Sequence, residues 1–148
     1  MYQDKYKELW GISCKEVIKG SNLDLIMKLS DTLETIYVGK RQNLDDYDKV
    51  SSILITKILM GTLGCVPAYD RYLVFTLSNC NIASISYNKQ SLSDIAGYYN
   101  ENRDKLEEFR NKVKESRKMD YPEMKILDMI FWYYGLSADQ KVKEVVRE

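Results

Sequence analysis

The chain has 148 residues, and its 22 Lys and Arg residues balance 22 Asp and Glu residues, so the formal net charge is zero. Hydrophobic residues make up 45% of the chain, which indicates one globular domain over residues 1–148 and excludes a disordered chain. The neutral charge also differs from the basic composition typical of nucleic-acid-binding proteins. Histidine is absent, which excludes Ser-His-Asp and Cys-His catalytic sites and most zinc sites. We therefore expect no metal, no cofactor and no enzymatic activity.

The three cysteines indicate where the protein resides. They are Cys14, Cys65 and Cys80, an odd number of residues that lie far apart in the sequence. No secretory signal opens the chain, and the longest apolar run, around residues 53–63, is too short to cross a membrane. We expect free thiols in a reducing cytoplasm and no membrane partner.

Two prolines and seven glycines are few for a chain of this length, which favours an all-α fold, a compact bundle of helices. The first predicted helix covers residues 3–19 and is weakened at Gly11. The second begins at Ser21, a good N-cap, and stops at Gly39. Its apolar residues recur at helical spacing. They are Leu25, Ile26, Leu29, Leu33, Ile36 and Tyr37.

The third predicted helix begins at Asp45 or Asp46 and runs to residue 63. Its apolar residues cover nearly the whole circumference, so we expect a buried central helix, with a buried strand as the alternative. Gly61 and Gly64 then interrupt the chain. Pro67 is expected to begin a fourth helix that runs to residue 76.

Residues 79–88 are the least helical stretch and predict a short extended arm. A fifth helix is expected over residues 91–116, with Ser91 as its cap. Its apolar residues follow a four-three spacing that resembles a coiled-coil seam, a route to a homo-oligomer. Asn102 is the polar member of that seam. It either fixes the register or marks the point where the apolar stripe leaves the core.

The sixth predicted helix begins at Pro122, ends at Gly135 and is the second central apolar helix. A short tail helix over residues 137–147 would then dock through three valines. These are Val142, Val145 and Val146.

Residues 61–72, GTLGCVPAYDRY, combine two glycines, a thiol and a proline with a run of polar side chains. One interpretation is a binding pocket with a thiol near a helix N-terminus. The other, which we favour, is a tight turn with a buried hydrogen-bond network. The spacing fits neither a Walker loop nor a dinucleotide fingerprint. The candidate residues are Cys65, Tyr69, Asp70, Arg71 and Tyr72.

Asp128 lies in an otherwise apolar helix and needs a partner, for which Arg71 is the candidate. Five cations between residues 110 and 118 form a candidate patch for nucleic acid or an acidic partner, although a solvated helix end is favoured. They are Arg110, Lys112, Lys114, Arg117 and Lys118. An acidic group, Asp45, Asp46 and Asp48, lacks the spacing of a calcium loop.

Residues 61–72 together with YPEMKILDMIFWYYG at 121–135 resemble a recurrent pattern in small, uncharacterised helical proteins of bacteria and phages. The two segments cover about a third of the chain. The resemblance brings no activity with it. It implies that both segments belong to one core and that the protein comes from a phage or mobile element. Proteins of that origin often bind a host or defence protein.

Three functions follow from these patterns. The first is a protein-binding module that inhibits or regulates a bacterial defence system, such as a CRISPR-type system, or a toxin; its 12 tyrosines suit binding surfaces. The second is a nucleic-acid-binding protein that uses the cations of residues 110–118. The third is a small enzyme or ligand-binding protein centred on residues 65–72. We rank them in this order.

Overall fold

The computed structural model describes residues 2–40 and 50–145, and within these ranges it contains helices and no strand. The prediction of an all-α fold is therefore confirmed, and an extended arm at residues 80–88 is not found. The elements are α1 (Tyr2–Lys5), the 3-10 helix η1 (Lys7–Leu9), α2 (Cys14–Val17), α3 (Gly20–Lys40), α4 (Ser52–Thr62), α5 (Arg71–Asn79), α6 (Lys89–Glu101), α7 (Arg103–Arg117) and α8 (Glu123–Val145).

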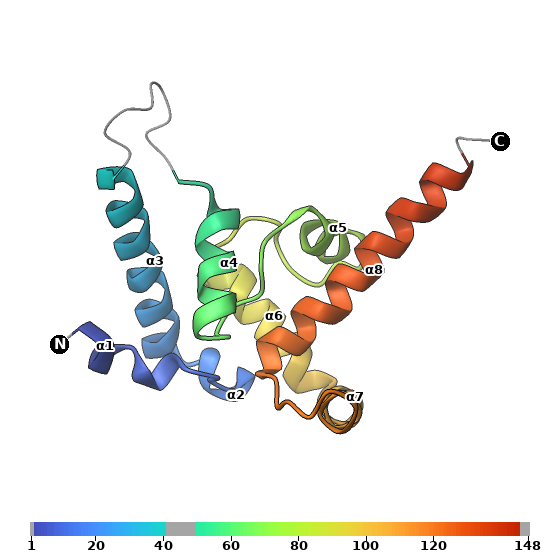
Figure 1. The fold of residues 1–148 in the computed structure, drawn as a ribbon, viewed down its shortest axis with the longest axis horizontal. Helices are drawn as coiled ribbons and strands as arrows, with labels where there is room; N and C mark the ends of the chain where they lie inside the picture. The colour runs from blue at the N-terminus through green and yellow to red at the C-terminus, as the bar shows by residue number, and fades with distance from the viewer. Residues whose placement is uncertain (1, 41–49, 146–148) are drawn as a thin grey trace.

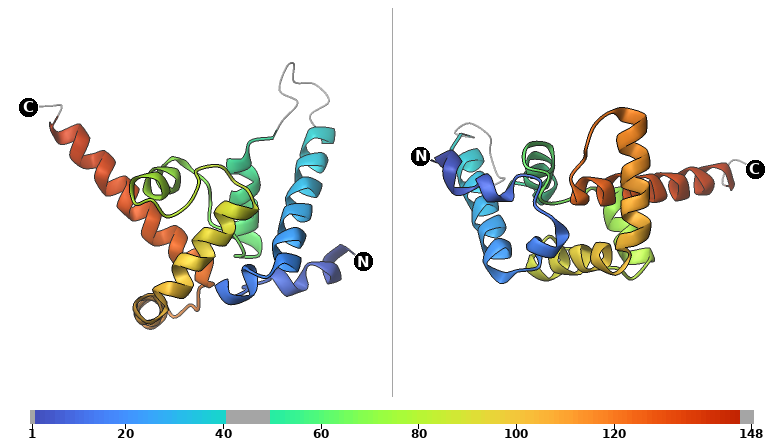
Figure 2. Two further views of the ribbon diagram at one scale, coloured as in Figure 1. Left: turned by 180° about the vertical axis from the view of Figure 1, so that it is seen from behind. Right: turned by 90° about the horizontal axis from the view of Figure 1, so that it is seen from below.

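Helices α3, α4 and α8 follow one another from left to right in Figure 1, and α6 lies behind α4 and the first turns of α8. The most extensive packing between helices joins α5 to the middle of α8, while α6 packs on α2 and α3. The last turns of α8 extend beyond the other helices (Figures 1 and 2). The core is one cluster to which α2 to α8 and the segment between α4 and α5 all contribute apolar side chains.

Side-chain caps decide where four of the described helices begin, namely α2, α4, α5 and α6. Ser51 accepts a hydrogen bond from the Ile53 amide and starts α4, so the predicted start at Asp45 or Asp46 is wrong; those two residues lie outside the described ranges. Asn88 accepts from the Ser91 amide and starts α6, so Ser91 lies inside the helix that it was expected to cap.

Asp70 caps α5 by accepting from the amides of Tyr72 and Leu73. The prediction that Pro67 begins this helix is wrong, because Pro67 lies in a non-helical segment between α4 and α5. Both choices obey local rules, but the carboxylate satisfies two free amides and proline satisfies none.

The predicted first helix is divided at Gly11, which adopts a positive φ of 61°. The Gly11 amide donates to the carbonyl of Leu63, 2.7 Å away at the end of α4, so a contact with a distant helix end stabilises this break. Ser13 then caps the short helix α2. Helix α3 forms as predicted, although it begins at Gly20 and continues through Gly39 to Lys40.

The predicted fifth helix is two helices. Helix α6 ends at Glu101, and α7 leaves in a different direction after Asn102, so that Figure 1 shows α7 end-on below the start of α8. Asn102 lies at the break between the two helices, so it fixes no register of a continuous seam. The apolar stripe does not leave the core at once, because Leu106 beyond the break is still buried, whereas Phe109 is exposed. A continuous seam over residues 91–116 is therefore absent.

Helix α8 begins next to Pro122 as predicted but does not end at Gly135. Gly135 lies inside the helix where α5 crosses it, and a Cβ atom there would lie 2.5 Å from the backbone oxygen of Tyr72. The glycine is needed for a close approach of two helices rather than for a stop. Residues 137–145 of the predicted tail helix continue α8. The side chains of Val142 and Val145, and Val146 as a whole, lie outside the described part of the chain.

Candidate functional site

The two segments singled out in the sequence, residues 61–72 and 121–135, pack directly on each other. Gly64 has a positive φ of 65°, and a Cβ atom there would lie 2.5 Å from the ring of Pro122. In α5, which begins within the first segment and continues beyond it, the Thr76 hydroxyl donates to the carbonyl of Phe131 at 2.8 Å. The expectation that both segments belong to one core is confirmed.

Asp128 is buried, and its carboxylate ties α8 to the segment between α4 and α5. One oxygen accepts from the Ala68 amide at 2.9 Å, and the other pairs with Lys125 at 2.9 Å. The predicted pair with Arg71 is wrong. Arg71 lies on the outer face of α5, with 70% of its side chain exposed, where it contacts the Tyr72 ring and lies 3.8 Å from Asp139. Arg71 follows the Asp70 cap and so points away from the core.

Tyr69 belongs to a buried network that holds α4, α6 and the segment before α5 together. Its amide donates to the Thr56 hydroxyl at 3.0 Å, and its phenol shares a hydrogen bond of 2.9 Å with Ser91. Its ring meets that of Tyr87 edge to face. Burial raises the pKa of the Tyr69 phenol, so it stays neutral at physiological pH. These contacts match the structural interpretation of this segment.

Cys65 lacks the features of a reactive thiol. It is 0% exposed, and burial raises its pKa to about 12. A nucleophilic cysteine requires a thiolate and access to solvent. Cys14 is also buried with a raised pKa, and all three cysteines are free. An enzyme centred on Cys65 therefore loses its proposed nucleophile.

Most cations of the predicted basic patch have partners on the protein itself. Arg110 pairs with Asp120 at 3.0 Å and donates to the carbonyl of Tyr121. Lys114 pairs with the same Asp120, and Lys112 with Glu108. Arg117 and Lys118 remain exposed near the end of α7. These neutralised charges do not favour binding of phosphates along the helix.

The structure contains a second charged cluster, around Glu123, which the sequence analysis did not predict. Glu123, only 6% exposed, accepts two hydrogen bonds from Arg103, at 2.9 and 3.2 Å, and one from the Cys14 amide at 2.7 Å. Burial alone would raise the pKa of Glu123, but these hydrogen bonds hold it below its usual value. Arg103 also stacks on the Tyr99 ring, whose phenol donates to Glu107. A glutamate directly after a proline at a helix start was the available signal, but its partner is 20 residues away in the sequence.

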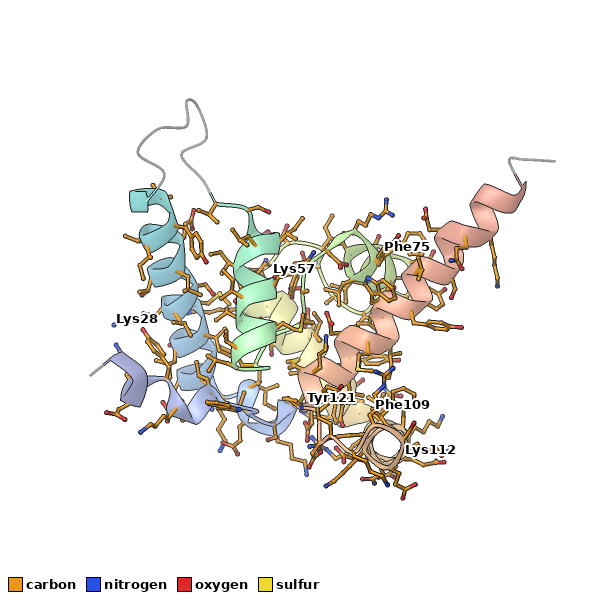
Figure 3. The ribbon with its side chains drawn as sticks, in the orientation of Figure 1. Lys28, Lys57, Phe75, Phe109, Lys112 and Tyr121 are labelled. Carbon is orange, nitrogen blue, oxygen red and sulfur yellow. The ribbon has the colours of Figure 1, made fainter. Side chains whose placement is uncertain are left out.

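An open groove lies over the outer face of the first half of α8, and we call it the α8 groove. Its volume is about 960 Å³. Its walls come from α4, through Lys57 and Met60, and from α7, through Phe109 and Arg117. In Figure 3, Lys57 and Phe109 lie on opposite sides of α8. From α8 itself, the apolar lining is Met129, Ile130, Trp132 and Tyr133.

A protein-binding role predicts tyrosines that gather on one exposed surface. Most described tyrosines are at least partly buried, but Tyr133 and Tyr134 are exposed on α8 next to Trp132. Tyr133 is 69% exposed and lines the α8 groove. Trp132 is held edge to face against Tyr72, with ring centroids 5.6 Å apart. The aromatic surface is therefore small and centred on α8.

A second groove, of about 580 Å³, separates the N-terminal segment from α3 and α4 and includes Trp10, which is 74% exposed.

Within the described ranges no group of three His, Cys, Asp or Glu side chains is arranged to hold a metal ion. None of the described helices is long and apolar enough to span a membrane.

Comparisons of the chain with protein-family models, curated proteins and solved structures found no match.

Proposed function

We propose that this protein is a protein-binding module and that the α8 groove is its docking surface. The observation that carries the proposal is the gathering of exposed aromatic side chains around an open apolar groove. Phe109, Trp132 and Tyr133 are all at least 39% exposed and line one groove. The other exposed aromatic rings of the described residues do not line it; they are Trp10, Tyr37, Phe75 and Tyr134. Rigid aromatic side chains that can be desolvated are the usual centres of protein interfaces.

The chemistry of the groove fits a protein better than a substrate. Its carboxylates are already engaged: Asp70 caps α5, and Asp128 binds Ala68 and Lys125. Met60 and Met129 line it with flexible thioethers, which adapt to apolar side chains of different shapes. A host or bacterial defence protein as the partner is part of this proposal and rests on the resemblance of the two core segments alone.

The experiment compares three forms of the tagged protein in lysates of the bacterium that carries the gene, or of the host of the phage. They are the unmodified chain, the groove variant Phe109→Ser/Tyr133→Ser, and the control Trp10→Ser/Ile85→Ser, which removes two other exposed apolar side chains, 74% and 53% exposed, that do not line the α8 groove. Each lysate is used both with and without nuclease treatment, and captured proteins are identified by mass spectrometry.

We expect one protein to be captured by the unmodified chain and by the control but lost from the groove variant. The purified partner should then bind with an affinity reduced at least tenfold by the groove substitutions. Equal capture by all three forms would contradict the proposal. Capture that disappears only with nuclease would favour nucleic acid as the ligand.

A further inference from the structure

The carboxylates that line the α8 groove are engaged in bonds within the described part of the protein, but two of its three cations are not. Three cations line it, Lys57, Arg117 and Lys125, and two carboxylates, Asp70 and Asp128. Lys125 pairs with Asp128, and Asp70 accepts two backbone hydrogen bonds. Lys57 and Arg117 are exposed and have no ion-pair partner among residues 2–40 and 50–145. The groove therefore presents an apolar floor with unneutralised positive charge on both walls.

The two walls place these cations on either side of the floor. Lys57 belongs to α4 and Arg117 is the last residue of α7. In Figure 3, α8 runs between Lys57 on α4 and Phe109 on α7. In the right-hand view of Figure 2, α4 and the C-terminal half of α7 stand on the same side of α8. A ligand on α8 would have a cation along each flank. Opposite charges placed there gain affinity and speed up association.

The backbone limits the form that a partner segment can take. Protein segments often bind by adding a strand to a sheet, but residues 2–40 and 50–145 form no strand to which one could be added. An extended segment in an apolar groove would leave its amides and carbonyls without partners. A helix satisfies these groups internally and can place its side chains between the ridges of neighbouring helices.

We infer that the α8 groove binds an acidic amphipathic helix of the partner protein, with apolar side chains on α8 and carboxylates facing Lys57 and Arg117. This inference rests on the proposed protein-binding function and specifies its ligand. From Lys125 to Tyr133 the floor is about 12 Å long, since each helical residue rises about 1.5 Å. That length accommodates two turns, enough for anchors at positions i, i+3 or i+4, and i+7.

The test uses three designed helical peptides of about 18 residues, long enough to form a helix in water. All share one apolar face of Leu, Phe and Trp, and their flanking positions carry Glu, Gln or Lys. Binding of each fluorescently labelled peptide to the full chain is followed by anisotropy between about 0.05 M and 0.5 M NaCl, a range over which exposed charges become screened.

We expect the Glu peptide to bind at least tenfold more tightly than the Lys peptide at low salt, and the difference to shrink at high salt. The variant Lys57→Glu/Arg117→Glu should reverse the order of the two peptides. The control Lys28→Glu/Lys105→Glu makes the same change in net charge at exposed sites outside the groove and should leave the order unchanged. Thermal unfolding verifies that both variants remain folded.

Tighter binding of the Lys peptide, equal binding of all three peptides, or no binding by any would overturn the inference. The proposed function would survive these results if the Phe109→Ser/Tyr133→Ser variant still lost its captured partner. If capture were also independent of the groove, both would fail. Binding of a labelled oligo(dT) that weakened in Lys57→Glu/Arg117→Glu would replace the helix with a single-stranded nucleic acid.

Discussion

The two ends of α7 carry the same kind of side chain in opposite circumstances. Arg103, its first residue, is partly buried, stacks on Tyr99 and forms two hydrogen bonds to Glu123. Arg117, its last residue, is exposed at the edge of the α8 groove. A buried cation at a helix N-terminus is unfavourable unless a carboxylate is present, whereas an exposed cation at a C-terminus is stable without one.

The two faces of α8 show the same contrast between groups that are paired within the protein and groups that are exposed. On the inner face, Glu123 and Gly135 each have a specific partner in another part of the fold, and Asp128, at the border of the groove, binds the Ala68 amide. On the outer face, Trp132 and Tyr133 stand partly in solvent. Burial forces side chains to be satisfied within the molecule, while exposure leaves groups for another molecule to engage. Substitutions on the two faces should therefore separate effects on stability from effects on binding.

The largest effect is expected from Glu123→Ala. It leaves Arg103 partly buried without its carboxylate and the Cys14 amide without an acceptor, which should cost about 3–5 kcal/mol of unfolding free energy. The exposed carboxylate of Asp120 provides the control: Asp120→Ala should cost less than about 1 kcal/mol. Urea unfolding followed by circular dichroism measures both. Equal losses would mean that the cluster at Glu123 is no more important than a surface ion pair.

Acid should weaken the same cluster. The folded-state pKa of Glu123 lies below its unfolded value, so its contribution to stability is complete above about pH 4.3 and is lost as the pH falls through the folded-state pKa. In Glu123→Gln the loss of stability between neutral and acid pH should be smaller than in the unmodified chain. Unfolding midpoints in urea across this pH range test the prediction, and parallel curves would contradict it.

Gly135→Ala should be destabilising by about 1–3 kcal/mol, because the new methyl group meets the Tyr72 backbone at the crossing of α5 and α8. The matched control is Gly97→Ala in α6, where nothing lies within 4 Å of the added Cβ. Since alanine favours helices, this variant should gain up to about 1 kcal/mol. Thermal unfolding should move the two midpoints in opposite directions; a gain in both would remove the close approach as the reason for Gly135.

Two substitutions of Asp128 should differ. Asp128→Ala leaves the buried Ala68 amide without an acceptor and should cost about 1–3 kcal/mol. Asp128→Asn keeps an oxygen for that amide and loses the ion pair with Lys125, so its cost should be smaller. Chemical unfolding distinguishes them. Since both variants lose the ion pair, equal losses would show that the ion pair, and not the backbone hydrogen bond, is what stabilises this position.

The smallest effect on stability is expected at the groove. Tyr133→Ser should change the unfolding free energy by no more than about 0.5 kcal/mol, as is usual for exposed positions. It should nevertheless reduce binding of the partner at least fivefold, measured by titration of the purified proteins. Loss of stability comparable to that of Asp128→Ala would place Tyr133 with the core instead of the binding surface.

Sequence patterns predicted the elements whose signals are local. The apolar spacing around Leu25, Ile26 and Leu29 gave α3, and Pro122 marked the start of α8. Patterns failed where a distant residue decided the outcome. Asp70, not Pro67, begins α5, and Gly135 is explained by the backbone of Tyr72, more than 60 residues earlier in the chain.

The candidate site was predicted in part. Cys65, Tyr69 and Asp128 were recognised as members of a core junction, but the partner of Asp128 was wrong, and the pairing of Arg103 with Glu123 was not anticipated. The basic run around Arg110 had a clear sequence signal, yet the carboxylate of Asp120 could be assigned to it only once the chain between α7 and α8 was placed in space.

The sequence by itself determined the all-α class and the apolar stripes of the long helices, because these depend on composition and on spacing along the chain. The tertiary structure alone decided which cations are paired, where the helix of residues 91–116 divides, and that α4, α7 and α8 enclose a groove. These features depend on contacts between residues far apart in sequence. Their energies come from burial, which no single helix has before it packs against the others.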